Sequence, residues 1–225
     1  MIPLRDKAPS GKFPIVTILL IVVNLLVFLM EVSLGEPQLK GLFDTYGSIP
    51  LRLKLAAQGD LHQGVGFAIT IVTSMFLHGG WLHLIGNMWY LWIFGDNVEG
   101  KLGRVRFLMF YLLCGAAACL AHAIVHVDSR VPTVGASGAI AGVLGAYLML
   151  YPKAKVLTWV PVIVVGYFIE FPAIVLLGLW FLMQLLNETL ALAGPGEVQS
   201  VAWTAHIGGF IAGMILVHVM RKKRL

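Results

Sequence analysis

Four polar residues stand inside apolar stretches of the sequence and carry side chains that could do chemistry together. They are Ser137, His206, His83 and Asn87. A serine hydroxyl becomes a good nucleophile when a neighbouring base takes its proton, and histidine is the commonest such base. Histidine and asparagine side chains can also donate hydrogen bonds to a developing oxyanion. The four residues therefore predict acyl-transfer chemistry, provided that the fold brings them together.

These four residues lie at a similar distance from a basic flank of the chain. Each stands 14–18 residues before the basic residue that follows its apolar stretch: His83 and Asn87 before Lys101, Ser137 before Lys153, and His206 before Arg221. If the stretches are helices, which rise about 1.5 Å per residue, all four residues lie roughly 21–27 Å from that flank. They are therefore expected to share one layer of the protein, on three different helices.

Stripes of small residues accompany the serine and the histidine. Gly138 and Gly142 follow Ser137 at helical spacing, while Gly209 and Gly213 form a GxxxG pair just after His206. Small residues let two helix backbones approach closely. Ser137 has a short side chain, so a hydrogen bond to His206 needs such an approach. The sequence therefore predicts that these two helices pack against each other.

The same residues also have purely structural interpretations. An intramembrane serine often bonds back to its own helix, and GxxxG alone implies only packing. His83 and Asn87 are four residues apart on one helix face, so they could hold two helices together instead of binding an oxyanion. Ser137 is expected in the first turn of its helix, where its backbone N–H lacks an intrahelical partner and could serve as an oxyanion donor. No Asp or Glu lies near His206 in the same stretch, so the predicted site is a dyad.

The elements that must hold these residues are membrane-spanning helices. The chain has 225 residues, 59% of them apolar and only 12% charged, with a mean hydropathy of +0.87. A spanning helix needs about 20 mainly apolar residues, and backbone inside a bilayer must bond internally. We expect an all-α polytopic protein with six spans, the first an uncleaved anchor, at about 14–33, 80–97, 104–127, 136–152, 172–194 and 201–220.

Basic residues predict the orientation of these spans. If there are six spans, most of the 16 lysines and arginines lie on one side of the membrane. That side is then the cytoplasmic side, and both termini lie on it. The basic residues on this side are Arg5, Lys7, Lys12, Lys101, Arg104, Arg106, Lys153, Lys155, Arg221, Lys222, Lys223 and Arg224. The predicted organisation is a cytoplasmic tail at 1–12, a six-helix domain at 13–220 and a basic cytoplasmic tail at 221–225. Because the charge lies at span ends, it indicates a lipid bilayer as partner and no nucleic acid.

A long outer loop is expected from about 31 to 79, between the first two spans. Its segment Leu51–Ala57 resembles a helix, Gly64–Gly66 is expected to break the chain, and part of the loop should lie at the outer membrane interface. The two cysteines, Cys114 and Cys119, are five residues apart within one span and point in different directions. They are expected to be buried small residues, and the sequence predicts no disulfide, metal or cofactor site.

At this point the sequence resembles the rhomboid family of intramembrane serine proteases. The resemblance runs from Pro14 to about Gly213. It is carried by several motifs in order: Thr73-Ser74-Met75-Phe76-Leu77-His78-Gly79-Gly80-Trp81-Leu82-His83, then His83-Leu84-Ile85-Gly86-Asn87, Gly135-Ala136-Ser137-Gly138, and Ala205-His206-Ile207-Gly208-Gly209 with Gly213. GxSG alone is shared with soluble hydrolases, whereas the full set on spanning helices is specific.

The resemblance implies a rhomboid-like bundle and a function. Ser137 and His206 would form the catalytic dyad, and His83 and Asn87 would join the backbone N–H of Ser137 in the oxyanion hole. Substrates would be transmembrane segments of other membrane proteins, cut near the outer face after a small residue. Span five would border the lateral substrate gate, and no cofactor or metal is implied. A prokaryotic cytoplasmic membrane is the expected location, and the oligomeric state is not defined.

Two positions depart from the common family pattern. Ile69-Thr70 replaces a frequent Trp-Arg pair in the first loop, and Ala141 replaces a Tyr that packs on the catalytic histidine. An alternative function is therefore a catalytically weak or inactive rhomboid-like protein that binds membrane clients. A transporter would instead carry charges near mid-membrane, and Glu170 and Glu188 are expected to be interfacial.

Overall fold

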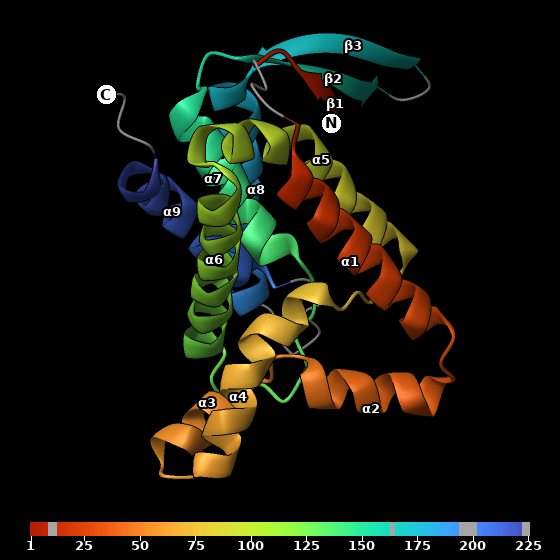
Figure 1. Cartoon of the computed structure of the whole chain (residues 1–225), viewed down its shortest axis with the longest axis vertical. Helices are drawn as coiled ribbons and strands as arrows, with labels where there is room; N and C mark the ends of the chain where they lie inside the picture. The colour runs from red at the N-terminus through yellow and green to blue at the C-terminus, as the bar shows by residue number, and fades with distance from the viewer. Residues whose placement is uncertain (9–12, 163–164, 194–201, 222–225) are drawn as a thin grey trace.

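The structure is a computed structural model that describes residues 1–8, 13–162, 165–193 and 202–221. Helices dominate these residues, and a small sheet lies across one end of them (Figure 1). The elements in chain order are β1 (Ile2–Asp6), α1 (Ile15–Val32), α2 (Glu36–Tyr46), α3 (Pro50–Ala57), α4 (Leu61–Thr73), the 3₁₀ helix η1 (Ser74–Phe76), α5 (Trp81–Leu102), α6 (Arg104–Val125), α7 (Ser137–Leu150), β2 (Lys155–Val162), β3 (Val165–Pro172), α8 (Ala173–Ala193) and α9 (Trp203–Met220).

The helical membrane architecture is confirmed. In the described part of the chain, α1, α6, α8 and α9 are each long and apolar enough to cross a bilayer. Helix α5 meets that test only together with α4 and η1, across a bend of 81°. Helix α7 is apolar but has only 14 residues. Each expected span thus corresponds to a helix, while the count of six membrane crossings stays a prediction.

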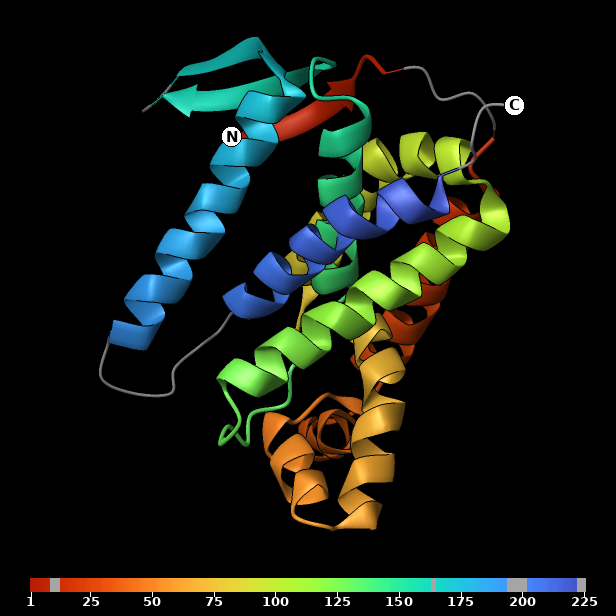
Figure 2. The same ribbon diagram turned by 90° about the vertical axis from the view of Figure 1, so that its left-hand side faces the viewer.

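Helix α7 is the central element of the bundle. Helices α5, α6, α8 and α9 all contact it, and α9 and α6 lie alongside it in Figure 2. Every residue from Gly138 to Tyr147 is buried. A helix that is apolar on all sides belongs in the interior. Because α7 is short, its first residue, Ser137, lies within the protein and not at an outer surface.

Glycines bring α7 and α9 into backbone contact. A Cβ atom on Gly209 would overlap the carbonyl oxygen of Gly138, and one on Gly213 would overlap the carbonyl oxygen of Gly142. Gly138 and Gly142 also face α6, where added Cβ atoms would meet Ala118 and Cys114. These are the glycines for which the sequence predicts packing around the site, and they lie at the three-helix contact of α6, α7 and α9.

The chain also contains a three-stranded antiparallel sheet that the sequence analysis did not predict. Its strand order is β1-β2-β3, with Ile2 opposite Trp159 and Lys155 opposite Pro172. Segment 155–172 is rich in β-branched and aromatic residues, which favour strands. The first residues of the chain, expected only as a cytoplasmic tail, supply the edge strand β1.

Side-chain contacts fix the sheet to the helices. The Tyr147 hydroxyl of α7 donates a hydrogen bond to Asp6 (2.6 Å), and the Trp89 indole of α5 donates to the carbonyl of Pro3 (2.6 Å). Burial raises the pKa of the Asp6 carboxyl above its usual value, although the bond from Tyr147 opposes this rise. The N-terminal strand β1 therefore pairs with β2 and is also held by side chains of α5 and α7.

Glu170 of β3 forms the ion pairs of this sheet. Its carboxylate contacts the ammonium groups of Lys7 and, at 3.5 Å, Lys155. The hydrogen bond from Lys7 is the main reason that the pKa of Glu170 is lowered from its usual value. Glu170 is partly exposed at this end of the bundle, and its expected place at a membrane interface stays a prediction.

The buried carboxylate of Glu99 joins α5 to the start of α1. It accepts hydrogen bonds from the backbone N–H groups of Val16 (3.0 Å) and Thr17 (2.8 Å), and from the Thr17 hydroxyl (2.8 Å). The first N–H groups of a helix have no intrahelical partners, and the helix dipole favours negative charge there. Glu99 therefore caps α1 from a second helix.

The first outer loop is mostly helical, with α2, α3 and α4 forming a compact group at the end of the molecule away from the sheet (Figures 1 and 2). The prediction of a helix at Leu51–Ala57 is confirmed by α3. The predicted break at Gly64–Gly66 was wrong, because α4 runs through both glycines. An added Cβ on Gly64 would meet the Ala56 side chain at 3.3 Å, so this glycine lets α3 and α4 pack closely.

Backbone and charged contacts attach this loop to the segment that precedes α7. Ser48 and Thr133 form a two-way backbone bridge, and the N–H of Leu51 donates to the carbonyl of Ser129 (3.0 Å). Lys54 pairs with Asp128 at 2.5 Å. This loop lacks the Trp-Arg pair that many rhomboids carry, and the contacts above anchor it instead. At the positions of that pair, Ile69 is exposed and Thr70 is buried.

Candidate active site

Ser137 is the first residue of α7, and the backbone before it has a conformation that requires glycine. Gly135 has φ +127°, and an added Cβ would lie 2.7 Å from the imidazole of His83. The N–H of Gly135 donates to the carbonyl of Ser74 (2.8 Å), which fixes the turn against η1. The chain can therefore pass directly beneath His83 and present Ser137 at the start of a helix.

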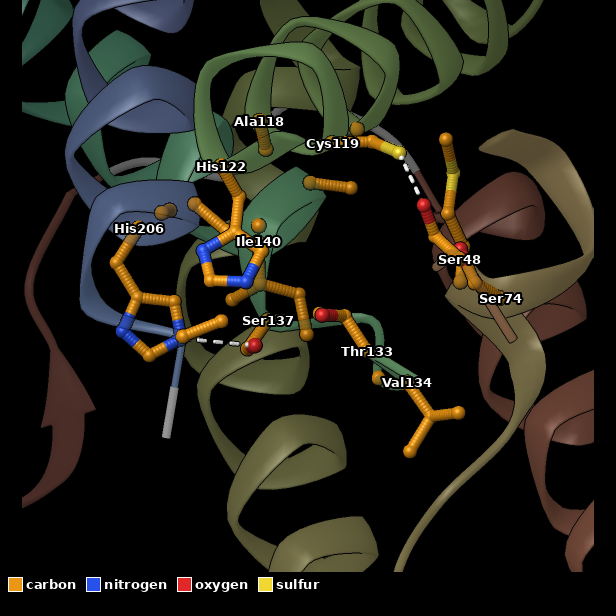
Figure 3. Close-up of a pocket in the computed structure, with 18 of the residues that line it drawn as sticks. Ser48, Ser74, Ala118, Cys119, His122, Thr133, Val134, Ser137, Ile140 and His206 are labelled. Carbon is orange, nitrogen blue, oxygen red and sulfur yellow. Dashed lines mark hydrogen bonds between the residues drawn. The ribbon is translucent and has the colours of Figure 1, made fainter. Parts of the chain in front are cut away.

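His206 lies in the first turn of α9 and reaches Ser137. Its Nε2 atom is 2.8 Å from the Ser137 hydroxyl oxygen, a normal hydrogen-bond length (Figure 3). Such a short distance between side chains on two helices depends on the backbone contact at Gly138 and Gly209. The structure thus brings the predicted nucleophile and the predicted base together.

Aromatic rings hold the His206 imidazole from two sides. The Trp180 ring of α8 lies 5.9 Å away at a tilt of 36°, and the Trp203 ring of α9 makes an edge contact at 6.0 Å. Position 141, where many rhomboids have a tyrosine, is a fully buried alanine. The aromatic support for the histidine therefore comes from α8 and α9 in this chain.

A fifth polar residue, Gln184 of α8, was missed by the sequence analysis. Its side-chain oxygen lies 2.8 Å from Nδ1 of His206, and the side chain is buried. The predicted dyad therefore has a third polar partner, supplied by an amide and not by a carboxylate. The available signal was a polar side chain in the middle of an apolar span, which is costly and usually functional.

His83 and Asn87 both lie against Gly135, beside Ser137. The Asn87 amide nitrogen would be 3.7 Å from a Cβ on Gly135. This nitrogen is buried and has no hydrogen-bond partner among the described residues. The His83 ring makes an edge contact with His78 at 5.1 Å. If Asn87 held two helices together, its amide would bond across them, so the unused donor favours a role in binding.

One cavity connects these residues. It has a volume of about 1040 Å³, and Ser137, His206, His83 and Asn87 all line it. Figure 3 shows His122 of α6 beside the Ser137–His206 pair, with Ser48 and Cys119 further along the wall. Ser48 and Cys119 contact each other at 3.0 Å, and both cysteines are free thiols. Among the described residues, no group of three His, Cys, Asp or Glu side chains is placed to hold a metal.

Glu188, expected to be interfacial, makes its contacts inside the protein, and its depth in a membrane stays a prediction. This residue lies one turn after Gln184, is buried, and contacts His126, the C-cap residue of α6, at 3.0 Å. Its other carboxylate oxygen accepts from the backbone N–H of Thr204 in α9 (3.1 Å). The reason is that α8 packs on α9, so a charged side chain near the end of a span found partners inside the protein.

The fold and site define a polytopic helical membrane protein with a hydrogen-bonded serine and histidine beside an internal cavity. The Rhomboid domain family matches residues 66–223, which include Ser137, His206, Gln184, His83 and Asn87. The chain therefore belongs to the rhomboid family.

Individual relatives agree with this assignment. The chain is 31% identical over 173 residues to RHOMBOID-like protein 5 of Arabidopsis thaliana, 36% over 151 residues to Rhomboid protein 1, mitochondrial, of Saccharomyces cerevisiae, and 36% over 140 residues to Rhomboid protease GluP of Bacillus subtilis. These matches cover 77%, 65% and 62% of this chain but only 50%, 40% and 25% of the relatives. Because the relatives include mitochondrial and plant proteins, the predicted prokaryotic membrane gains no support from them.

Proposed function

We propose that this protein is an intramembrane serine endopeptidase that cleaves transmembrane segments of other membrane proteins. The observation that carries the proposal is the 2.8 Å contact between the Ser137 hydroxyl and His206 Nε2, in a cavity that also presents the unpartnered amide of Asn87. A nucleophile, its base and an oxyanion donor are the minimum set for acyl transfer.

In the first step, the Ser137 oxygen attacks the carbonyl carbon of the scissile peptide bond while His206 Nε2 takes the hydroxyl proton. The carbonyl oxygen becomes an oxyanion. When the tetrahedral intermediate collapses, the C–N bond breaks and His206 returns the proton to the leaving amine. The products are a released amine fragment and an acyl ester on Ser137.

The oxyanion would be bound by donors from two elements. The backbone N–H of Ser137 lies in the first turn of α7, where no intrahelical acceptor is available and the helix dipole favours negative charge. The Asn87 amide nitrogen is buried and unused. His83 packs on the same turn and can donate from its ring. These donors are fixed before the reaction, so little reorganisation is needed as charge develops.

In the second step, water hydrolyses the acyl ester with His206 as base. The water must reach a site that is enclosed by helices. The cavity extends from Ser137 past His122 to Ser48 and Thr133 near the outer loop, and these polar groups line a route for water. The released carboxylate product leaves Ser137 with its hydroxyl restored.

The depth of Ser137 supports substrate cleavage inside the membrane, towards one face. Helix α7 has 14 residues, so Ser137 lies about 20 Å from the sheet end of the bundle. Basic groups gather at that end, where Lys101 lies over the Tyr151 ring and Arg106 donates to the carbonyl of Met220. With this end in the cytoplasm, a core of about 30 Å places Ser137 below the outer surface.

Cleavage of a model transmembrane protein in proteoliposomes tests the proposal. The substrate carries a small residue near the outer end of its span, and the variants are Ser137→Ala and His206→Ala. We expect both variants to lose cleavage, and a fluorophosphonate probe to label the wild type at Ser137 only. Cleavage that persists in Ser137→Ala would refute the mechanism. If the wild type binds such substrates but neither cuts them nor reacts with the probe, the client-binding alternative is correct.

A further inference from the structure

We propose that Gln184 is a positioning residue that keeps the proton of His206 on Nδ1, so that Nε2 is free to act as the base. This inference rests on the proposed function and names a residue of the same site. It follows from a chain of donors and acceptors that starts at a backbone carbonyl of α8.

The first link is the contact between Gln184 and Trp180. The Gln184 amide nitrogen lies 3.1 Å from the carbonyl oxygen of Trp180, one turn earlier in α8. A backbone carbonyl oxygen can only accept hydrogen bonds. The group facing it must therefore be the NH₂ of the side-chain amide, because a side-chain oxygen in that place would leave two acceptors in contact.

The second link is the contact between Gln184 and His206. With the NH₂ turned to Trp180, the Gln184 oxygen faces Nδ1 of His206 at 2.8 Å. An amide oxygen is also only an acceptor, so Nδ1 must carry the hydrogen. In a neutral imidazole, protonation of one ring nitrogen leaves the other as an acceptor. Nε2 therefore has a free lone pair, and the Ser137 hydroxyl at 2.8 Å must be the donor.

Burial makes this arrangement effective. Gln184 is only 5% exposed, so an unmade hydrogen bond there could not be replaced cheaply by bulk water. The opposite tautomer of His206 would place an N–H against the Ser137 hydroxyl and two acceptors against each other at Gln184. A single amide, itself aligned by Trp180, thus excludes the tautomer that could not take the serine proton.

The same helix face reaches α9 at a second point. Glu188 is one turn beyond Gln184 and accepts from the backbone N–H of Thr204, two residues before His206. Gln184 acts on the His206 side chain and Glu188 on the backbone that carries it. The first turn of α9 is therefore held by α8 at two successive turns, and only the contact from Gln184 bears on the tautomer.

The test combines kinetics with a direct measurement of the tautomer. Gln184→Met keeps the length of the side chain but removes the acceptor. Gln184→Glu keeps an acceptor oxygen for Nδ1, and its carboxyl group, when protonated, can still donate to the Trp180 carbonyl. Thr189→Val is the matched control, because it removes a polar group from the same helix at an exposed position, where the hydroxyl donates to the carbonyl of Leu185 in its own helix. The tautomer is read from long-range proton–nitrogen correlations of labelled histidine, with the His206 signals assigned by their loss in His206→Ala.

We expect wild-type His206 to be protonated at Nδ1. Gln184→Met should lower kcat by about 10- to 100-fold, or about 1.4–2.7 kcal/mol in barrier, with KM within about twofold and a mixture of tautomers. Gln184→Glu should keep the Nδ1 proton and recover most of kcat, and Thr189→Val should match the wild type. The contrast between Met and Glu separates the acceptor from simple packing.

Either of two outcomes would overturn the inference. One is a wild-type His206 protonated at Nε2, and the other is a folded Gln184→Met protein with unchanged kcat and tautomer. If Gln184→Met does not fold, the wild-type tautomer and the Gln184→Glu kinetics still decide the question. Failure of the proposed function looks different, since the wild type would then neither cleave nor react with the probe, whatever the tautomer of His206.

Discussion

Replacing Gly209 by alanine tests whether the backbone contact of α7 and α9 sets the geometry of the site. The added methyl group would overlap the carbonyl oxygen of Gly138, which is held by its own helix and cannot rotate away. The two helices must therefore separate locally. Gly138 follows Ser137 directly, and Gly209 is three residues after His206, so the separation acts on both reacting side chains.

The size of the effect follows from two opposing terms and one distance. Overpacking a tight contact typically costs about 1–3 kcal/mol, whereas alanine in place of a helical glycine gains about 0.5–1 kcal/mol. The expected net loss of unfolding free energy is about 0–2.5 kcal/mol. The Ser137–His206 bond is 2.8 Å long and is lost beyond about 3.5 Å, so a helix shift of about 0.7 Å suffices to break it. Because a general base contributes about 10²–10⁴ in rate, cleavage should fall at least tenfold.

Gly178→Ala provides a matched control for this experiment. Gly178 lies in α8, and an added Cβ there meets no atom within 4 Å. The same chemical change should therefore leave cleavage within about twofold and raise stability slightly. Thermal or denaturant unfolding in mixed micelles measures the stability of each variant. The rates of substrate cleavage and of probe labelling at Ser137 measure its activity.

Two results would refute the reasoning about Gly209. One is a Gly209→Ala protein with wild-type stability and cleavage, which would mean that the helices are further apart than the structure indicates. The other is an equal loss in Gly178→Ala, which would mean that glycine flexibility, and not close contact, is what matters. A Gly209→Ala protein that is less stable yet labels Ser137 at the normal rate would show that this contact supports stability but does not set the geometry of the site.

Three further predictions follow from other contacts. Asn87→Ala should lower kcat by about 10²–10³ in the cleavage assay, with little change in stability, because its amide nitrogen has no partner in the resting structure. Glu99→Ala should lower the unfolding free energy by about 2–4 kcal/mol in denaturant titrations, because three hydrogen bonds to the start of α1 are lost. The pKa of Glu170 is lowered in the folded protein, so its contribution to stability should be complete above pH 4.5, the ordinary pKa of a glutamate. This contribution should disappear as the pH falls through the pKa of Glu170 in the folded protein. The wild type should therefore lose more stability on acidification than Glu170→Gln.

Each of these predictions has a contrary outcome. An Asn87→Ala protein with normal kcat would leave the oxyanion to His83 and the Ser137 N–H. For Glu99, the control is Glu36→Ala on the exposed start of α2, and equal losses in the two variants would argue against capping of α1. For Glu170, parallel pH profiles of wild type and Glu170→Gln would show that the ion pairs with the sheet lysines do not contribute.

The reacting residues were predictable because their signals are local and chemically costly. Ser137 and His206 are polar groups within apolar stretches, and the glycines beside them mark close helix contact. The expected convergence of the three helices is also seen, since α5 and α9 both contact α7, while the depth of the residues in a membrane stays a prediction. In these stretches the bilayer restricts the backbone to helices, so hydropathy alone places the elements.

The missed features depend on long-range partners. The position of Gln184 within an apolar span marks it as unusual, but its partner His206 is set by the packing of α8 on α9, which the local sequence does not show. The strands at 155–172 resemble in composition the residues that flank a membrane span, so they were not recognised as strands. The strand β1, which pairs with β2, lies far away in the sequence. Glu188 was likewise taken for an interfacial residue because its partners His126 and Thr204 are distant in sequence.

The sheet also constrains the order in which the protein can assemble. Strand β1 leaves the ribosome well before its partners, because Asp6 bonds to a residue 141 positions later and pairs with a strand beyond it. Closing so long a loop is entropically unfavourable until intervening contacts exist. The helices from α1 to α7 must therefore be inserted before the N-terminal residues find their places, and the strand that begins the chain is among the last to fold.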